Sequence, residues 1–153
     1  MDYNKVKALV DEALTENESL FLIELAISTN NKIQVIVDGD NGVPLSECIR
    51  ISRNVEHNLD RESEDFSLEV STPDISNPLK LKRQYIKNIG RILKVKTEEK
   101  EFEGKLDKAD DLQLTLVWKT REPKPIGKGK VTVEKTVTLT YKEIKEAKVK
   151  IVF

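Results

Sequence analysis

The stretch FSLEVSTPDISNPLKLKRQYIKNIGR, residues 66–91, divides the chain into two parts with different sequence patterns. At its start, apolar residues alternate with polar ones, which predicts a strand containing Phe66, Leu68 and Val70. Pro73 and Pro78 then end this pattern, because each proline removes a backbone donor and fixes its own φ. After the prolines the chain is basic, with no acidic residue from 75 to 91. We therefore expect the chain to pass from one domain into another here.

The residues up to the first proline predict an open sheet with helices packed on it. Apolar residues recur at helical spacing in two segments and alternate in three others. The expected elements are a helix over residues 2–15, strands over 20–27 and 32–37, a helix over 45–60 and a strand over 66–71. The first strand is predicted to be central, because both of its faces are largely apolar. On one face we place Phe21, Ile23, Leu25 and Ile27.

The second helix is expected to begin at Ser46, which is a suitable N-cap residue. Its apolar stripe is predicted to contain Leu45, Cys48, Ser52, Val55 and Leu59.

The residues after the second proline predict a small β-barrel. A short helix is expected over residues 81–89, ended by Gly90. Five short strands are expected over residues 92–96, 102–106, 112–118, 131–141 and 148–153. A closed barrel suits such strands, because closure removes exposed edges. The basic segment 119–130 is predicted to be a mobile loop.

The sequence therefore predicts an α+β protein in two domains. An N-terminal α-β-β-α-β open-sheet domain is expected over residues 1–80, and a small β-barrel domain over residues 81–153.

Composition and charge indicate a cytoplasmic protein with two oppositely charged halves. The single cysteine cannot form an internal disulfide, and no apolar run approaches the roughly 20 residues of a membrane helix. Residues 1–72 carry 15 acids and 6 bases, a net charge of −9; residues 73–153 carry 12 acids and 20 bases, a net charge of +8. The basic half favours surroundings rich in nucleic acid.

The residues that could carry chemistry do not form a recognisable catalytic or metal site. His57 is the only histidine and is predicted to lie on the surface, whereas Cys48 belongs to an apolar stripe. The loop DGDNG, residues 38–42, fails as a calcium loop, because its twelfth position is Ile49 rather than a glutamate. No nucleophile and base can be paired. We therefore predict no catalytic residue, no metal and no cofactor, and binding remains as the expected activity.

Two groups of basic residues are candidates for binding RNA. The first contains Lys80, Lys82, Arg83, Lys87 and Arg91; the second contains Lys119, Arg121, Lys124, Lys128 and Lys130. Solvated charge that aids solubility is an equally good interpretation. Aromatic residues make up only 5% of the chain, so contact with phosphates is favoured over base recognition.

Three segments resemble the ribosome maturation factor RimP family. FSLEVST, a proline, NPLKL and then IKNIGRILKV resemble the family signature Leu-Glu-Val-Ser-Ser-Pro-Gly followed by Arg-Pro-Leu. VIVDGDNGVPLSECIRISRNVEHNLD resembles the family's strand, loop and helix, and KEIKEAKVKIVF resembles its closing segment. The resemblance covers nearly the whole chain in order. It departs at Asp74, where the family has glycine, and at Asn77, where it has arginine.

The resemblance implies an N-terminal α/β domain, a C-terminal SH3-like barrel and a non-enzymatic assembly factor. The implied partners are the precursor of the small ribosomal subunit and a small-subunit ribosomal protein of the decoding region. The acidic half would suit that basic protein, and the basic half would suit ribosomal RNA. We expect a monomer without membrane contact. Partner contacts are expected at Asp38, Asp40, Glu69, Pro73, Asp74, Asn77, Pro78, Leu79, Lys80, Lys82 and Arg83.

Two other functions remain open from the sequence. A stand-alone RNA-binding regulator that uses the basic half is the first alternative, and steep salt dependence of binding to bare RNA would favour it. An enzyme is the more distant alternative, because no nucleophile and base can be assigned.

Overall fold

The computed structural model describes residues 1–151. The chain forms two compact units, Met1–Asp74 and Ile75–Phe153, and each encloses its own apolar core. We call them the N-terminal unit and the C-terminal unit. The domain limits expected from the sequence, 1–80 and 81–153, stay a prediction. Among the described residues, no helix is long and apolar enough to cross a membrane.

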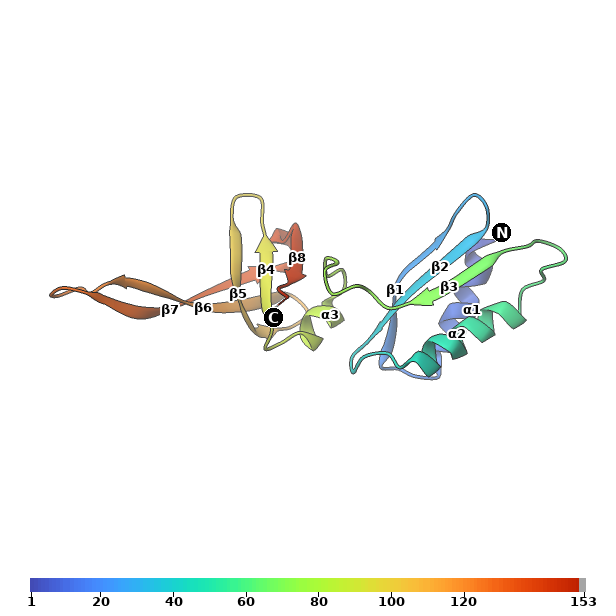
Figure 1. Cartoon of the computed structure of the whole chain (residues 1–153), viewed down its shortest axis with the longest axis horizontal. Coiled ribbons are helices and arrows are strands. Elements are labelled where there is room, and N and C mark those ends of the chain that lie inside the picture. Colours follow the sequence, from blue (N-terminus) through green and yellow to red (C-terminus); the bar gives the residue numbers. More distant parts are fainter. Residues whose placement is uncertain (152–153) are drawn as a thin grey trace. The chain divides into compact units, whose positions relative to one another are not determined.

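The N-terminal unit has the predicted α-β-β-α-β order. Its elements are α1 (Tyr3–Thr15), β1 (Leu20–Ile27), β2 (Lys32–Gly39), α2 (Leu45–His57) and β3 (Ser67–Ser71). The sheet order is β1-β2-β3, with β1 and β2 antiparallel and β2 and β3 parallel. Both helices pack on the same face of the sheet (Figure 1). A parallel pair needs a long crossover, which α2 provides here.

The prediction that the first strand is central is wrong, because β1 lies at an edge and β2 occupies the middle. A shift of register between Leu22 and Glu24 makes Ile23 an extra residue, which is a β-bulge. Leu25 therefore faces the same side as Leu22, whereas Phe21 faces the opposite side. The regular alternation that the sequence suggested is broken at this point.

The inward face of β2 lies at the centre of the core. The fully buried side chains of this unit come from both helices and from β2: Val6, Val10, Ile33, Val35, Val37, Ile51 and Val55.

The predicted stripe of α2 is partly wrong. Val55 is buried as expected, but Leu45 is 75% exposed, and the fully buried Ile51 was not placed in the stripe. The N-cap is Pro44 rather than Ser46, because the helix begins one residue before the serine.

The C-terminal unit is rich in β-structure. Its elements are α3 (Lys82–Lys87), β4 (Ile92–Lys96), β5 (Glu101–Ala109), β6 (Gln113–Pro123), β7 (Lys130–Thr140), the 3-10 helix η1 (Tyr141–Glu143) and β8 (Glu146–Val149). The antiparallel order is β7-β6-β5-β4-β8. This ladder is open, so the closed barrel stays a prediction. Of the expected last strand, residues 152 and 153 lie outside the described residues.

The prediction of a loop over residues 119–130 is wrong for residues 119–123, which belong to β6, and for Lys130, which begins β7. The mobility of this segment stays a prediction. β6 and β7 stay paired as far as Pro123 and Lys130. The turn between them contains Gly127 and Gly129, whose positive φ angles of 85° and 97° favour glycine. We call residues 119–134 the hairpin arm.

Two isoleucines of α2 give a matched test of this core. Ile51 is fully buried and Ile49 is 42% exposed. Ile51→Ala is expected to lower the free energy of unfolding by about 2–5 kcal/mol, because it leaves a cavity. Ile49→Ala should change it by only about 0.5 kcal/mol. Urea denaturation followed by helical circular dichroism measures both, and equal losses would contradict the assignment of the buried face.

Candidate partner-binding surfaces

The residues that follow Pro78 are held in place within the C-terminal unit by hydrogen bonds from their backbone amides. The Leu79 amide donates to the carbonyl of Ala147 in β8, at 2.8 Å. The side-chain oxygen of buried Gln84 accepts from the amides of Lys80 and Leu81, at 2.7 and 3.0 Å. The first turn of α3 and the residues before it therefore have a fixed conformation.

These residues border a small cavity of about 210 Å³, which we call the tyrosine pocket. The rings of Tyr85 and Tyr141 lie 5.0 Å apart between centroids, tilted by 56°. The Lys82 ammonium lies 5.8 Å from the centroid of Tyr141, within the range of a cation–π contact. The full lining is Leu79, Lys80, Lys82, Tyr85, Tyr141, Ile144, Lys145 and Glu146.

Burial controls the ionisation of the two tyrosines. Desolvation, with a further contribution from Tyr141, raises the pKa of Tyr85 to about 12. Burial, and then the nearby Asp110 and Asp111, raises the pKa of Tyr141. Both shifts favour the neutral form of the ring. The lining holds three lysines and one glutamate, so the pocket favours a negatively charged group.

The three predicted acidic contact residues belong to the N-terminal unit. Asp38 is only 8% exposed, and its carboxylate accepts from the Gly39 amide at 2.8 Å. Asp40 is exposed just beyond β2, and Glu69 is exposed on β3 opposite Gln34. Along the sheet, Glu69 lies roughly 13 Å from Asp38. The structure thus brings two of the three acids close together.

The loop that carries Asp40 is a tight turn between β2 and α2. A Cβ atom on Gly39 would overlap the carbonyl oxygen of Gly42, and Gly42 has a φ of +84°. The Asp40 amide donates to the Ser19 carbonyl at 2.8 Å. These constraints hold the turn in one conformation.

The remaining predicted contacts fall on both sides of the division between the units. Pro73 and Asp74 belong to the N-terminal unit, whereas the later ones belong to the C-terminal unit. Pro73, Leu79 and Arg83 are half-buried, and the exposed members are Asp74, Asn77, Pro78, Lys80 and Lys82. The structure gathers Leu79, Lys80 and Lys82 at the tyrosine pocket, and contact with a partner stays a prediction for every member.

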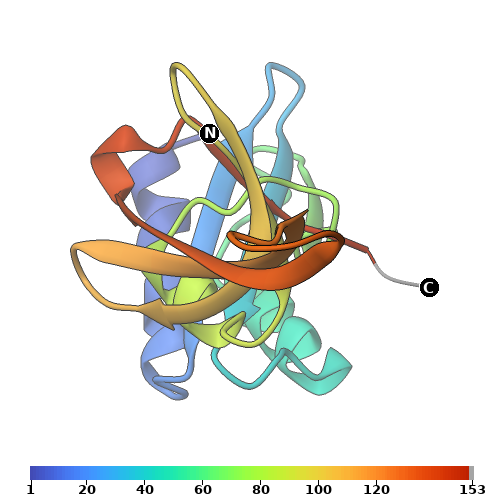
Figure 2. The same cartoon turned by 90° about the vertical axis from the view of Figure 1, so that its left-hand side faces the viewer.

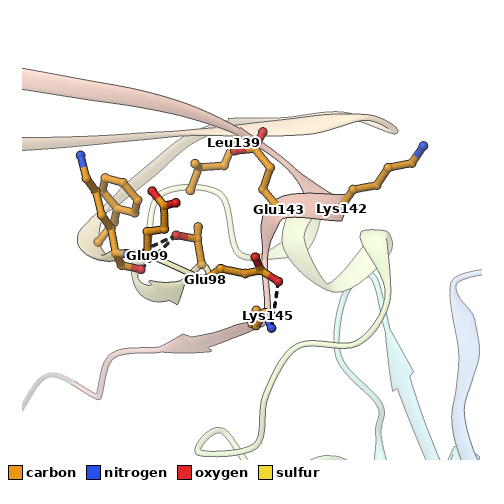
Figure 3. Close-up of a pocket in the computed structure, with 9 residues that line it drawn as sticks. Glu98, Glu99, Leu139, Lys142, Glu143 and Lys145 are labelled. Carbon is orange, nitrogen blue, oxygen red and sulfur yellow. Dashed lines mark hydrogen bonds and ion pairs between the residues drawn. The ribbon is translucent and has the colours of Figure 1, made fainter.

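The C-terminal unit also contains a larger hollow of about 550 Å³, which the sequence did not predict (Figure 3). Phe102 and Leu139 supply its apolar lining. Its charged rim comes from two distant segments, and Lys145 pairs with Glu98 at 3.1 Å. The charged residues are Glu98, Glu99, Lys100, Lys142, Glu143 and Lys145. Three acids and three bases balance one another, so the hollow does not favour a ligand of either sign.

The fold and these surfaces define an α+β protein in which an acidic α-β-β-α-β unit precedes a basic, β-rich unit.

Comparison with known proteins gives its family. Residues 9–76 match the RimP N-terminal domain. The ribosome maturation factor RimP of Christiangramia forsetii is 57% identical over 149 residues, which is 97% of each chain. The RimP of Flavobacterium psychrophilum is 52% identical over the same shares. That of Porphyromonas gingivalis is 33% identical over 76% of this chain and 92% of its own length. The chain belongs to the RimP family.

The tyrosine pocket predicts a loss of stability at alkaline pH. Because the pKa of Tyr85 is raised from 10.0 to about 12, the folded protein holds this proton more tightly than the unfolded chain. The resulting stabilisation is complete below the unfolded pKa and is lost as the pH rises through the folded one. Urea denaturation followed by Trp118 fluorescence, at about pH 9 and about pH 11, should show this decline. Tyr85→Phe should decline less, and equal declines would contradict the assignment.

Proposed function

We propose that this protein is a ribosome maturation factor that binds the immature small ribosomal subunit. The observation that carries the proposal is the identity of more than half of the residues, along 97% of both chains, with relatives named ribosome maturation factor RimP. We propose that it acts by binding and not by turnover, since stabilising one conformation of an assembly intermediate is sufficient.

The division of charge between the two units supports two kinds of partner. The N-terminal unit, Met1–Asp74, carries 16 acids and 6 bases, whereas the C-terminal unit carries 11 acids and 20 bases. We propose that the acidic unit contacts a basic ribosomal protein of the small subunit and that the basic unit lies near ribosomal RNA. Complementary potential of this kind favours rapid and specific association.

The arrangement of the C-terminal unit supports the proposal of an SH3-like barrel. Four consecutive antiparallel strands precede a 3-10 helix, and a short last strand pairs with the first of them, β4. This strand order leaves only β7 and β8 without a second neighbour among the described strands.

Sedimentation of cell extract on a sucrose gradient tests the main proposal. We expect the protein to sediment with free small subunits and not with translating ribosomes. A position only at the top of the gradient would overturn the proposal.

Charge reversal tests the part assigned to the acidic unit. The double variant Asp40→Lys and Glu69→Lys should weaken binding to isolated small-subunit ribosomal proteins by about tenfold or more, because charged contacts across an interface set affinity and association rate. Asp38 is left unchanged, because its carboxylate is buried and hydrogen-bonded.

The matched control carries the same change of charge elsewhere in the unit. Glu12 and Glu62 are exposed, one on α1 and one after α2. The double variant Glu12→Lys and Glu62→Lys should bind about as well as the unaltered protein. Equal weakening in both variants would show that the net charge of the unit, and not the position of Asp40 and Glu69, determines the affinity.

A further inference from the structure

The hairpin arm continues beyond the sheet of the C-terminal unit. β5 pairs with β6 only as far as Val117, whereas β6 and β7 stay paired to Pro123 and Lys130. Figure 1 shows the arm as a two-stranded ribbon beyond β5, and Figure 2 shows it from the end. An isolated two-stranded hairpin is only marginally stable in water. The arm contributes no residue to the buried core of this unit.

The two faces of the arm differ in chemistry. Val131 and Val133 lie on the face that continues the apolar side of the sheet, together with Thr120 and Glu122, and Trp118 precedes the arm on this face. The opposite face carries Lys119 and Arg121, and the strand beside them adds Thr132, Glu134 and Lys130. Arg121 donates to the Thr132 hydroxyl at 3.0 Å, so its guanidinium is positioned along the ribbon.

The basic residues of the arm are not neutralised. The arm contains five bases and two acids, and Glu122 already pairs with Lys135 at 3.0 Å. Among the described residues, no ion pair involves Lys119, Arg121, Lys124, Lys128 or Lys130. The lysines on β4, on β8 and directly after β8 provide the contrast, because each pairs with a glutamate: Lys94, Lys96, Lys148 and Lys150. The excess positive charge of this sheet is therefore concentrated on the arm.

We propose that the hairpin arm binds double-helical RNA through its sugar–phosphate backbone. The paired part of the ribbon is roughly 17 Å long, enough to cross a groove and reach phosphates on both sides. The wide, shallow minor groove of A-form RNA is open to such a ribbon and displays 2′-hydroxyl groups, which Thr132 can contact. The arm has no aromatic residue. Because single strands are bound largely by stacking on aromatic rings, a duplex is the favoured partner.

This inference deepens the proposed function and rests on it only for the ribosomal origin of the RNA. The contact itself follows from the charge and geometry of the arm, so it can be tested with bare RNA.

The test compares two triple variants of the whole chain. The arm variant is Lys119→Gln, Arg121→Gln and Lys130→Gln. The control variant is Lys94→Gln, Lys96→Gln and Lys148→Gln, which removes the same charge from lysines that are ion-paired. Five of the six residues are exposed, and Lys148 is half-buried. Thermal unfolding followed by Trp118 fluorescence should show that both variants remain folded. If the arm variant does not remain folded, the double variant Lys124→Gln and Lys128→Gln, with both changes in the turn, is used in its place.

The probe is an RNA duplex of about 16 base pairs, the span that double-stranded RNA-binding domains cover, titrated by fluorescence anisotropy at several salt concentrations. We expect the arm variant to bind about tenfold more weakly at low salt, with a salt slope reduced by about 2, because each phosphate contact releases counterions. The control variant should stay within about twofold, because its lysines lie outside the arm and each has a glutamate within 4 Å.

Four results would overturn the proposal: no binding of the duplex by the unaltered protein, equal loss in both variants, tighter binding of the single strand, or loss of a protein partner while RNA affinity stays unchanged. Sedimentation separates this proposal from the previous one. If the unaltered protein sediments with small subunits but does not bind the duplex, only the role of the arm fails. If it binds the duplex but stays at the top of the gradient, only the role in maturation fails.

Discussion

The burial of one face of β2 determines the arrangement of the N-terminal unit. Ile33, Val35 and Val37 are fully buried beneath the two helices. Burying each such side chain contributes about 1.5–3 kcal/mol, so a shift of register by one residue, which would turn all three outward, is strongly disfavoured. A strand held in this way is best placed between two others. β1 reaches one side through a short turn, and β3 reaches the other after the α2 crossover.

The sequence predicts the elements of this unit better than the positions of its strands in the sheet. Helical and alternating patterns are local, so α1, β2 and β3 were predicted close to their observed bounds. The position of a strand in a sheet depends on its partners, and both β1 and β2 are apolar enough to be central. A bulge is also invisible to a count of alternating residues. The extra residue, Ile23, places Phe21 and Leu25 on opposite faces although their spacing suggests one face.

The candidate surfaces were predictable only where their residues are close in the sequence. Lys80 and Lys82 were found because they form a basic cluster after the prolines. Tyr141 was not found, because it reaches Tyr85 only through the fold of the C-terminal unit. The hollow in Figure 3 was missed for the same reason, since antiparallel pairing of β4 with β8 brings Glu98 near Lys145. Predicting such sites requires knowledge of which strands pair, and the local periodicity of the sequence does not give this information.

The hairpin arm shows how charge and local stability are linked. Its alternating residues form strands, but beyond Trp118 they have no third strand and little apolar surface to bury. Repulsion among bases without acidic partners weakens such a ribbon further. Segments with few buried contacts lie at the low end of local stability, where ligand-binding elements are commonly found. A polyanion that binds the folded ribbon relieves this repulsion and stabilises the ribbon by mass action. The same five bases that destabilise the arm without a partner are therefore the ones that would supply affinity in the proposed contact with RNA.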